Sequence, residues 1–231
     1  MINSLLFISL APVLIIAFYI YSRDKYEKEP ISILLKALLI GILIVLPVVL
    51  IEKLLMAFSE SMEMEGISNA AYSAFIVAGF TEEFMKFIAF YIFFWRNKNF
   101  NERFDGIVYA VFISLGFAGI ENLLYVFTGG YAIGLVRALT AVPAHALFGI
   151  VMGYYFGLAK FSQSHRSLYL FMAFFMAFSF HGLYDFLLMG NSPLLLTAFV
   201  PLFIYFWISG FKKLEKASVN SSFRRTTNDD Q

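Results

Sequence analysis

The stretch MINSLLFISLAPVLIIAFYIYS (1–22) contains no charged side chain and determines the class of fold. A run of about 20 apolar residues is long enough to cross the hydrocarbon core of a bilayer as a helix. The run lacks the basic start of a cleavable signal peptide, so we interpret it as a retained first span. We therefore expect the chain to enter a lipid bilayer here.

Composition extends this interpretation to the whole chain. Of 231 residues 60% are hydrophobic, and the mean hydropathy is +0.76, well above that of a soluble domain. The alternation of short strands that marks a membrane barrel is absent from the pattern. The sequence predicts an all-α fold, a polytopic transmembrane helical bundle with about seven spans (seven to eight), at 3–22, 32–54, 70–95, 107–128, 139–159, 168–189 and 193–211.

The links between the spans predict the orientation. Lys and Arg are frequent in the first, third and fifth links and in the tail, whereas the other links together contain only Arg137. Positive links face the cytoplasm, so the N-terminus is expected outside and the C-terminus inside. We expect residues 1–211 to form one membrane domain and the polar segment 212–231 to be a disordered cytoplasmic tail.

Two simple counts exclude other functions. The net charge of +1 gives no reason to expect a nucleic-acid partner. The absence of cysteine excludes disulfides, thiolate catalysis and metals bound by cysteine.

Ionisable residues inside the predicted spans are the main functional signal. Each costs on the order of 3 kcal/mol at the middle of a membrane helix, so such residues usually serve a function. Four different spans place polar groups between the middle of the membrane and its outer surface, where they could line one cavity open to the outside. These residues are Glu82, Glu83 and Lys86 on the third span, Glu121 and Asn122 on the fourth, His145 on the fifth, and His181 and Asp185 on the sixth.

Local spacing predicts some of their contacts. Lys86 lies four residues after Glu82 and three after Glu83, so it can reach either acid on the helix surface. His181 and Asp185 are also four residues apart, and a carboxylate there can orient the imidazole. Nearby glycines permit close helix packing; they are Gly79, Gly116, Gly119, Gly149, Gly153 and Gly182.

Three classes of function use intramembrane acids and histidines: a proton-coupled transporter, a hydrolase and a non-catalytic scaffold. A hydrolase without a serine or cysteine dyad would activate water with a carboxylate or a metal ion. Zinc is an alternative because Glu and His can bind it, although the HExxH motif is absent. These residues alone do not decide between a hydrolase and a transporter.

Five segments in this order resemble the PrsW family of bacterial membrane proteases. The family is itself similar to the CAAX-prenyl-protease and bacteriocin-processing superfamily of intramembrane glutamic proteases, and the resemblance covers residues 10 to 210. The segments are EKEP (27–30), TEEFMK (81–86), FDGIVYAVFISLGFAGIENLLYV (104–126), HALFG (145–149) and HGLYDF (181–186).

The resemblance implies a biological role. Such a protease performs site-1 cleavage of a single-span membrane anti-sigma factor on its extracytoplasmic side. This cleavage starts regulated intramembrane proteolysis and a sigma-factor stress response. The chain would then be a multi-pass protein of the bacterial cell membrane, in contact with lipid.

The resemblance also implies roles for individual residues. Glu82 or Glu83 would be the general base, and His145 would help to hold the attacking water. His181 and Asp185 would occupy the positions that stabilise the oxyanion. A glutamic mechanism needs no cofactor, and zinc is the alternative. The supporting residues of the site are expected to be Lys86, Glu121, Asn122 and Asp185.

Overall fold

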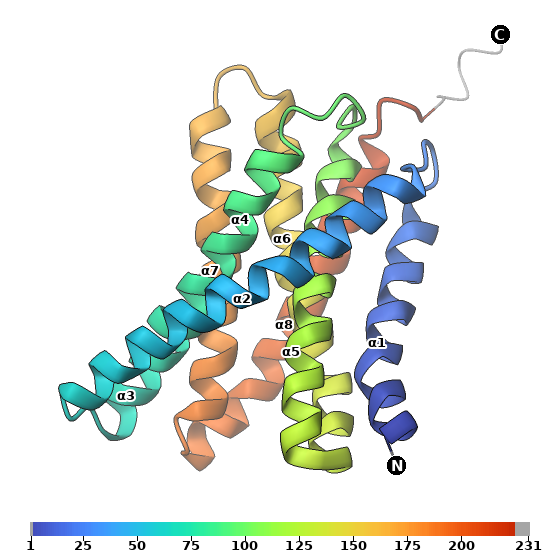
Figure 1. Ribbon diagram of the computed structural model, residues 1–231. Helices are drawn as coiled ribbons and strands as arrows, with labels where there is room; N and C mark the ends of the chain where they lie inside the picture. The colour runs from blue at the N-terminus through green and yellow to red at the C-terminus, as the bar shows by residue number, and fades with distance from the viewer. Residues whose placement is uncertain (1, 225–231) are drawn as a thin grey trace, which may run out of the picture.

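The computed structural model describes residues 2–224, and all regular secondary structure in that range is helical. The all-α prediction is therefore confirmed (Figure 1). The helices are α1 (Ile2–Arg23), α2 (Ile31–Ser61), α3 (Gly66–Ala71), η1 (Tyr72–Phe80), α4 (Thr81–Phe93), α5 (Arg103–Leu139), α6 (Ala141–Phe161), α7 (Arg166–Met189) and α8 (Pro193–Val219).

Five helical stretches within the described residues are long and apolar enough to cross a membrane. One of them, Arg103–Phe161, contains both α5 and α6, and η1 and α4 lie outside all five. The protein is therefore a polytopic helical bundle, and the exact count of seven spans stays a prediction. In Figure 1 most helices run roughly parallel, while α2 crosses the bundle diagonally.

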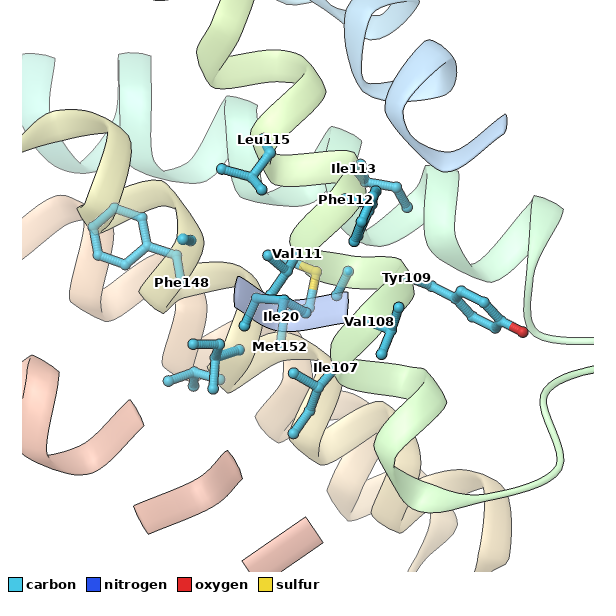
Figure 2. Close-up of a cluster of buried hydrophobic side chains, with 14 of the residues drawn as sticks. Ile20, Ile107, Val108, Tyr109, Val111, Phe112, Ile113, Leu115, Phe148 and Met152 are labelled. Atoms are coloured by element: carbon cyan, nitrogen blue, oxygen red, sulfur yellow. The ribbon is translucent and has the colours of Figure 1, made fainter. Parts of the chain in front are cut away.

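Helices α5 and α6 form the centre of the bundle. Helix α5 packs against α1, α2 and α6, and most of its first half is buried. Gly106 on α5 faces Gly153 and Gly157 on α6 so closely that an added Cβ at any of them would collide with the opposite backbone. This close approach brings together large apolar side chains of both helices, including Ile107, Val111 and Met152 (Figure 2).

The structure corrects the prediction that residues 129–137 form a link. Helix α5 continues to Leu139 with one kink, at Gly130, where φ is 81° and ψ is −172°. Glycine adopts this backbone conformation readily and other residues do not. The kink changes the direction of the last turns of α5, and the site described below depends on it because those turns carry Arg137.

The basic links lie at one end of the molecule. The α1–α2, α4–α5 and α6–α7 connections and the end of α8 are all at the top of Figure 1, opposite the N-terminus. Helix α8 continues to Val219, so the first part of segment 212–231 is helical. Residues 225–231 lie outside the described range, and the disorder expected there stays a prediction.

Candidate functional site

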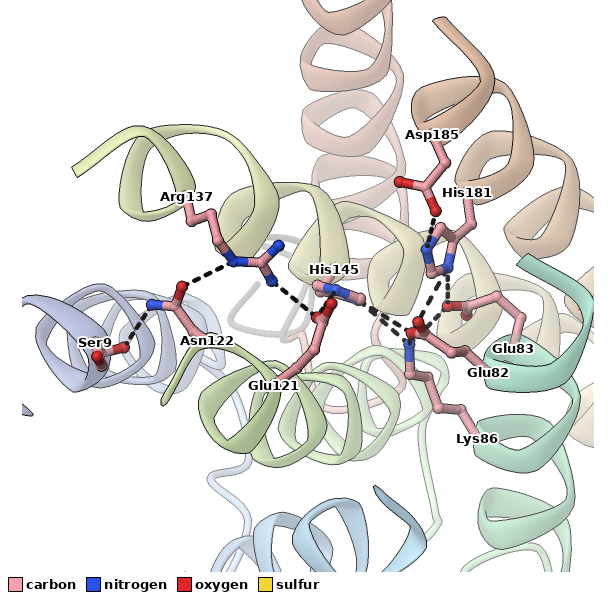
Figure 3. A network of polar contacts seen from close by, with 10 residues as sticks. All are labelled: Ser9, Glu82, Glu83, Lys86, Glu121, Asn122, Arg137, His145, His181 and Asp185. Carbon is pink, nitrogen blue, oxygen red and sulfur yellow. Dashed lines mark hydrogen bonds and ion pairs between the residues drawn. The ribbon is translucent and has the colours of Figure 1, made fainter. Parts of the chain in front are cut away.

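The structure brings the eight polar residues of the four predicted spans into one connected network (Figure 3). Helix α4 contributes Glu82, Glu83 and Lys86, and α5, α6 and α7 contribute the others. The third histidine of the chain, His165, is exposed just before α7 and takes no part in the network.

Lys86 is the centre of the network. Its Nζ donates to Glu82 Oε2 at 3.0 Å, to Glu83 Oε1 at 2.8 Å and to His145 Nδ1 at 3.2 Å. The sequence predicted that Lys86 could reach either acid, and in the structure it contacts both at once. An ammonium has three N–H donors, so these three partners satisfy it completely although Lys86 is only 1% exposed.

The contact with Lys86 assigns the tautomer of His145. An ammonium can only donate, so His145 Nδ1 accepts and the ring proton is on Nε2. That nitrogen donates to Glu121 Oε2 at 2.8 Å. The carboxylate of Glu121 also pairs with Arg137 Nη2 at 3.0 Å. His145 is thus held between the ammonium of Lys86 and the carboxylate of Glu121.

Asn122 connects the network to α1. Its Oδ1 accepts from Arg137 Nε at 3.0 Å, and its Nδ2 donates to the carbonyl oxygen of Ser9 at 3.0 Å. Asn122 is fully buried, so these bonds satisfy an amide that would otherwise be costly to bury. It therefore positions Arg137 and fixes the site against the half of α1 near the N-terminus.

His181 lies between two carboxylates. Its Nδ1 is 2.9 Å from Glu83 Oε1, and its Nε2 is 3.2 Å from Asp185 Oδ2. Ionised carboxylates only accept, so with both acids ionised the ring donates from both nitrogens and is positively charged. The predicted contact with Asp185 is present, and it fixes the plane of the ring.

A cavity of about 350 Å³ is formed next to the network by α2, η1, α4, α5, α6 and α7. Glu82, His145 and His181 contribute to its wall, while Glu83 does not. Exposure increases along the cavity, from 6% for the Glu82 side chain to 20% for Glu121. The cavity therefore opens on the side of Glu121.

The sequence did not reveal two charged residues of this cavity, Glu52 and Arg137. Glu52 is next to Lys53 in the sequence, but adjacent residues on a helix do not face each other, and no ion pair between them occurs among residues 2–224. Glu52 instead lines the cavity from α2. Arg137 was placed in a link, because the pattern does not reveal that α5 continues past its kink.

The segment before α4 positions its acids. Residues Tyr72–Phe80 form a π-helix, a rare form that often occurs at functional sites. At the end of this segment Gly79 packs on α7, and a Cβ there would lie 3.1 Å from the backbone nitrogen of Gly182. The two glycines let η1 and α7 approach closely, which places Glu83 within hydrogen-bond distance of His181.

The network also contains a set of potential metal ligands. Ligand atoms of Glu82, Glu83, His145 and His181 all lie within 4.8 Å of one another, and two imidazoles with two carboxylates suit zinc. However, the Lys86 ammonium bonds to three of these four side chains. A metal ion would have to displace Lys86, so the arrangement described here does not fit one.

Comparisons with known proteins identify the family. A family profile described as "PrsW family intramembrane metalloprotease" matches residues 29–209. The chain is 41% identical over 190 residues to Protease PrsW of Geobacillus kaustophilus, covering 82% of this chain and 81% of the relative. It is 38% identical to Protease PrsW of Clostridioides difficile over 218 residues, covering 92% and 90%.

A third relative, Protease PrsW of Bacillus subtilis, is 35% identical over 214 residues, covering 91% of this chain and 94% of the relative. No solved structure matches the chain. The matched range contains every residue of the network except Ser9. This chain belongs to the PrsW family of intramembrane proteases.

Proposed function

We propose that this protease activates water with Glu82 as the general base. The observation that carries the proposal is the different position of the two adjacent acids. Glu82 lines the cavity, whereas Glu83 is 0% exposed and bonded to Lys86 and His181. A general base must reach the water that it deprotonates. Glu83 then positions Lys86 and His181.

The other residues have supporting roles in this mechanism. His145 lines the same cavity and helps to hold the water. His181 supplies positive charge to the oxyanion as the peptide carbonyl is attacked. Asp185 orients His181 through Nε2, which accounts for a carboxylate near a developing negative charge. Glu121, Asn122 and Arg137 hold His145 in place.

The mechanism contains no metal step, although the family description includes the word metalloprotease. Three of the four potential ligands are bonded to Lys86, and this supports a glutamic mechanism. A chelator of transition metals, such as 1,10-phenanthroline, should leave cleavage unchanged. Inhibition that added zinc reverses would overturn this part of the proposal.

The proposed substrate is a single-span membrane anti-sigma factor, cut on its extracytoplasmic side. The proposal rests on the resemblance described above together with the expected orientation, in which the N-terminus is outside. The position of the network supports it, because Asn122 donates to the carbonyl oxygen of Ser9, in the half of α1 that is nearer the N-terminus. Water would then reach Glu82 from outside the cell.

The test is cleavage of a tagged single-span anti-sigma factor co-expressed with the protease in cells. Glu82→Gln and His145→Ala should each lower cleavage by at least about 100-fold. The matched control is Glu60→Gln, which changes an exposed acid at the end of α2 and should cleave normally. Equal cleavage by all variants at equal protein levels would overturn the assignment.

A further inference from the structure

A second group of acidic side chains is buried at the other end of α5. It lies between the α1–α2 connection and the start of α5, far from the cavity. Asp24, Glu29, Glu102 and Asp105 are at most 2% exposed, and Glu27 is half-buried. None of these five carboxylates pairs with a Lys, Arg or His anywhere in residues 2–224.

Several oxygen atoms of this group have no hydrogen-bond partner in the described part of the chain. Both carboxylate oxygens of Glu29 are in this state, as are Asp24 Oδ1, Glu27 Oε2 and Asp105 Oδ1. Two uncharged groups join them, the amide oxygen of Asn101 and the hydroxyl of Tyr109. Tyr109 is fully buried and lies beside Glu29. Buried polar atoms normally have hydrogen-bond partners. So many buried oxygen atoms without one in a single place indicate that a ligand binds there.

The other bonds of the group hold it in place. Asp24 Oδ2 accepts from the backbone nitrogen of Glu29 at 3.0 Å. Asp105 Oδ2 accepts from the backbone nitrogens of Asn101 and Glu102, at 2.9 and 2.7 Å. One oxygen of each aspartate is thus fixed by the backbone while the other is left without a partner.

The geometry fits a cation. One oxygen each from Glu27, Glu29 and Asp105 lie within 4.8 Å of one another. Oxygen ligands bind Ca²⁺ at about 2.3–2.6 Å and Mg²⁺ at about 2.0–2.1 Å, so ligands on opposite sides of either ion are about 4–5 Å apart. A donor set made only of oxygen favours these hard ions over zinc or copper.

Electrostatics also favour a positive ligand. The five carboxylates lie close together, and no Lys, Arg or His in residues 2–224 forms an ion pair with any of them. A bound metal ion would offset the repulsion between their negative charges.

We propose that Glu27, Glu29 and Asp105 bind a hard divalent cation, Mg²⁺ or Ca²⁺, that fastens the α1–α2 connection to the start of α5. Glu102, next to the site, accepts a hydrogen bond from Ser221 after α8. The ion would therefore order the end of the bundle where three segments distant in sequence meet. This site is separate from the proposed peptidase site and does not depend on it.

The first test measures Mn²⁺ binding by electron paramagnetic resonance to the full-length protein purified in detergent at neutral pH. We expect one bound Mn²⁺ per chain. The ion that displaces this Mn²⁺ at the lower concentration, Mg²⁺ or Ca²⁺, is the preferred ligand. Glu27→Gln and Glu29→Gln should weaken binding by at least about 10-fold. Glu27→Gln is the safer variant, because Glu27 is half-buried and its amide can still accept from Asn101.

Controls separate this site from the peptidase network. Binding should be unchanged in Glu60→Gln and in Glu82→Gln. The preferred ion should also raise the melting temperature of the wild type and of both controls, but not of Glu29→Gln. Absence of bound Mn²⁺, or binding that is lost in Glu82→Gln and kept in Glu27→Gln, would overturn the proposal.

Discussion

The ammonium of Lys86 is bonded to two carboxylates and one imidazole from two helices, out of contact with solvent. Its position explains how three ionisable groups can lie so close together inside a membrane protein. Buried charges need partners, and removal of one partner leaves the others uncompensated. Lys86 is therefore a structural requirement of the site as well as a part of its electrostatics.

Replacement of Lys86 by Met should lower the free energy of unfolding by about 3–5 kcal/mol, because two buried carboxylates lose their cation. The double variant Lys86→Met/Glu83→Gln should recover much of this loss, since it removes one of the two charges. Lys53→Met, at an exposed position on α2, should stay within about 0.5 kcal/mol of the wild type. Thermal unfolding in detergent measures all three, and simple additivity in the double variant would contradict the coupling.

Arg137 acts on the chemistry through Glu121 and His145. Arg137→Gln should lower kcat by about 10-fold or more while KM changes little, because the imidazole loses its fixed position. Arg137→Lys keeps a charge near Glu121 and should recover part of kcat. Arg166→Gln, on the exposed start of α7, is the matched control and should have wild-type kinetics. A change in KM alone would indicate a role in substrate binding.

At the scale of elements, the site depends on how closely η1 and α7 approach. Gly79 and Gly182 form this contact, and the π-helix that contains Gly79 leads directly into the two acids of α4. Because the backbones touch, a small shift of η1 moves Glu82 and Glu83 relative to His181. Helix packing here controls catalytic geometry.

Gly79→Ala tests this dependence. Its Cβ would lie 2.9 Å from the carbonyl oxygen of Ala74 and 3.1 Å from the nitrogen of Gly182, so we expect a loss of about 1–3 kcal/mol from overpacking. Cleavage should fall as well. In Gly119→Ala the nearest atom, Val13 Cγ2, is 3.6 Å away, so stability and cleavage should be preserved. Equal behaviour of the two variants would contradict the packing interpretation.

Periodicity and charge predicted most of the helical ranges and most of the polar residues of the network, but not its full geometry. The polar side chains on the third to sixth spans could be found because charges in apolar runs are conspicuous. The contribution of Glu52 could not, since it depends on how α2 crosses the bundle. The same holds for Arg137, whose position depends on the backbone of a single residue, Gly130. The π-helix could not be predicted either, because it changes the hydrogen-bond register of the backbone without a change in the pattern of residues.

At the scale of the whole molecule, the main open prediction is orientation. Since the chain has no cysteine, single cysteines can be introduced without background. A membrane-impermeant thiol reagent added to intact cells should label Glu60→Cys, at the end of α2. It should label Lys98→Cys, in the α4–α5 connection, only after the cells are permeabilised. The reverse pattern would place the cavity on the cytoplasmic side.

The three-way contact of Lys86 also limits how this sequence can change during evolution. A lineage that loses the lysine by a single substitution keeps two buried acids without the ammonium that they share, and selection against unstable protein removes it. Loss of the acid at Glu83 restores the balance, whereas loss of Glu82 would remove the proposed base. Positions 83 and 86 are therefore expected to vary together among distant relatives, and a relative with a neutral residue at one should have a neutral residue at the other.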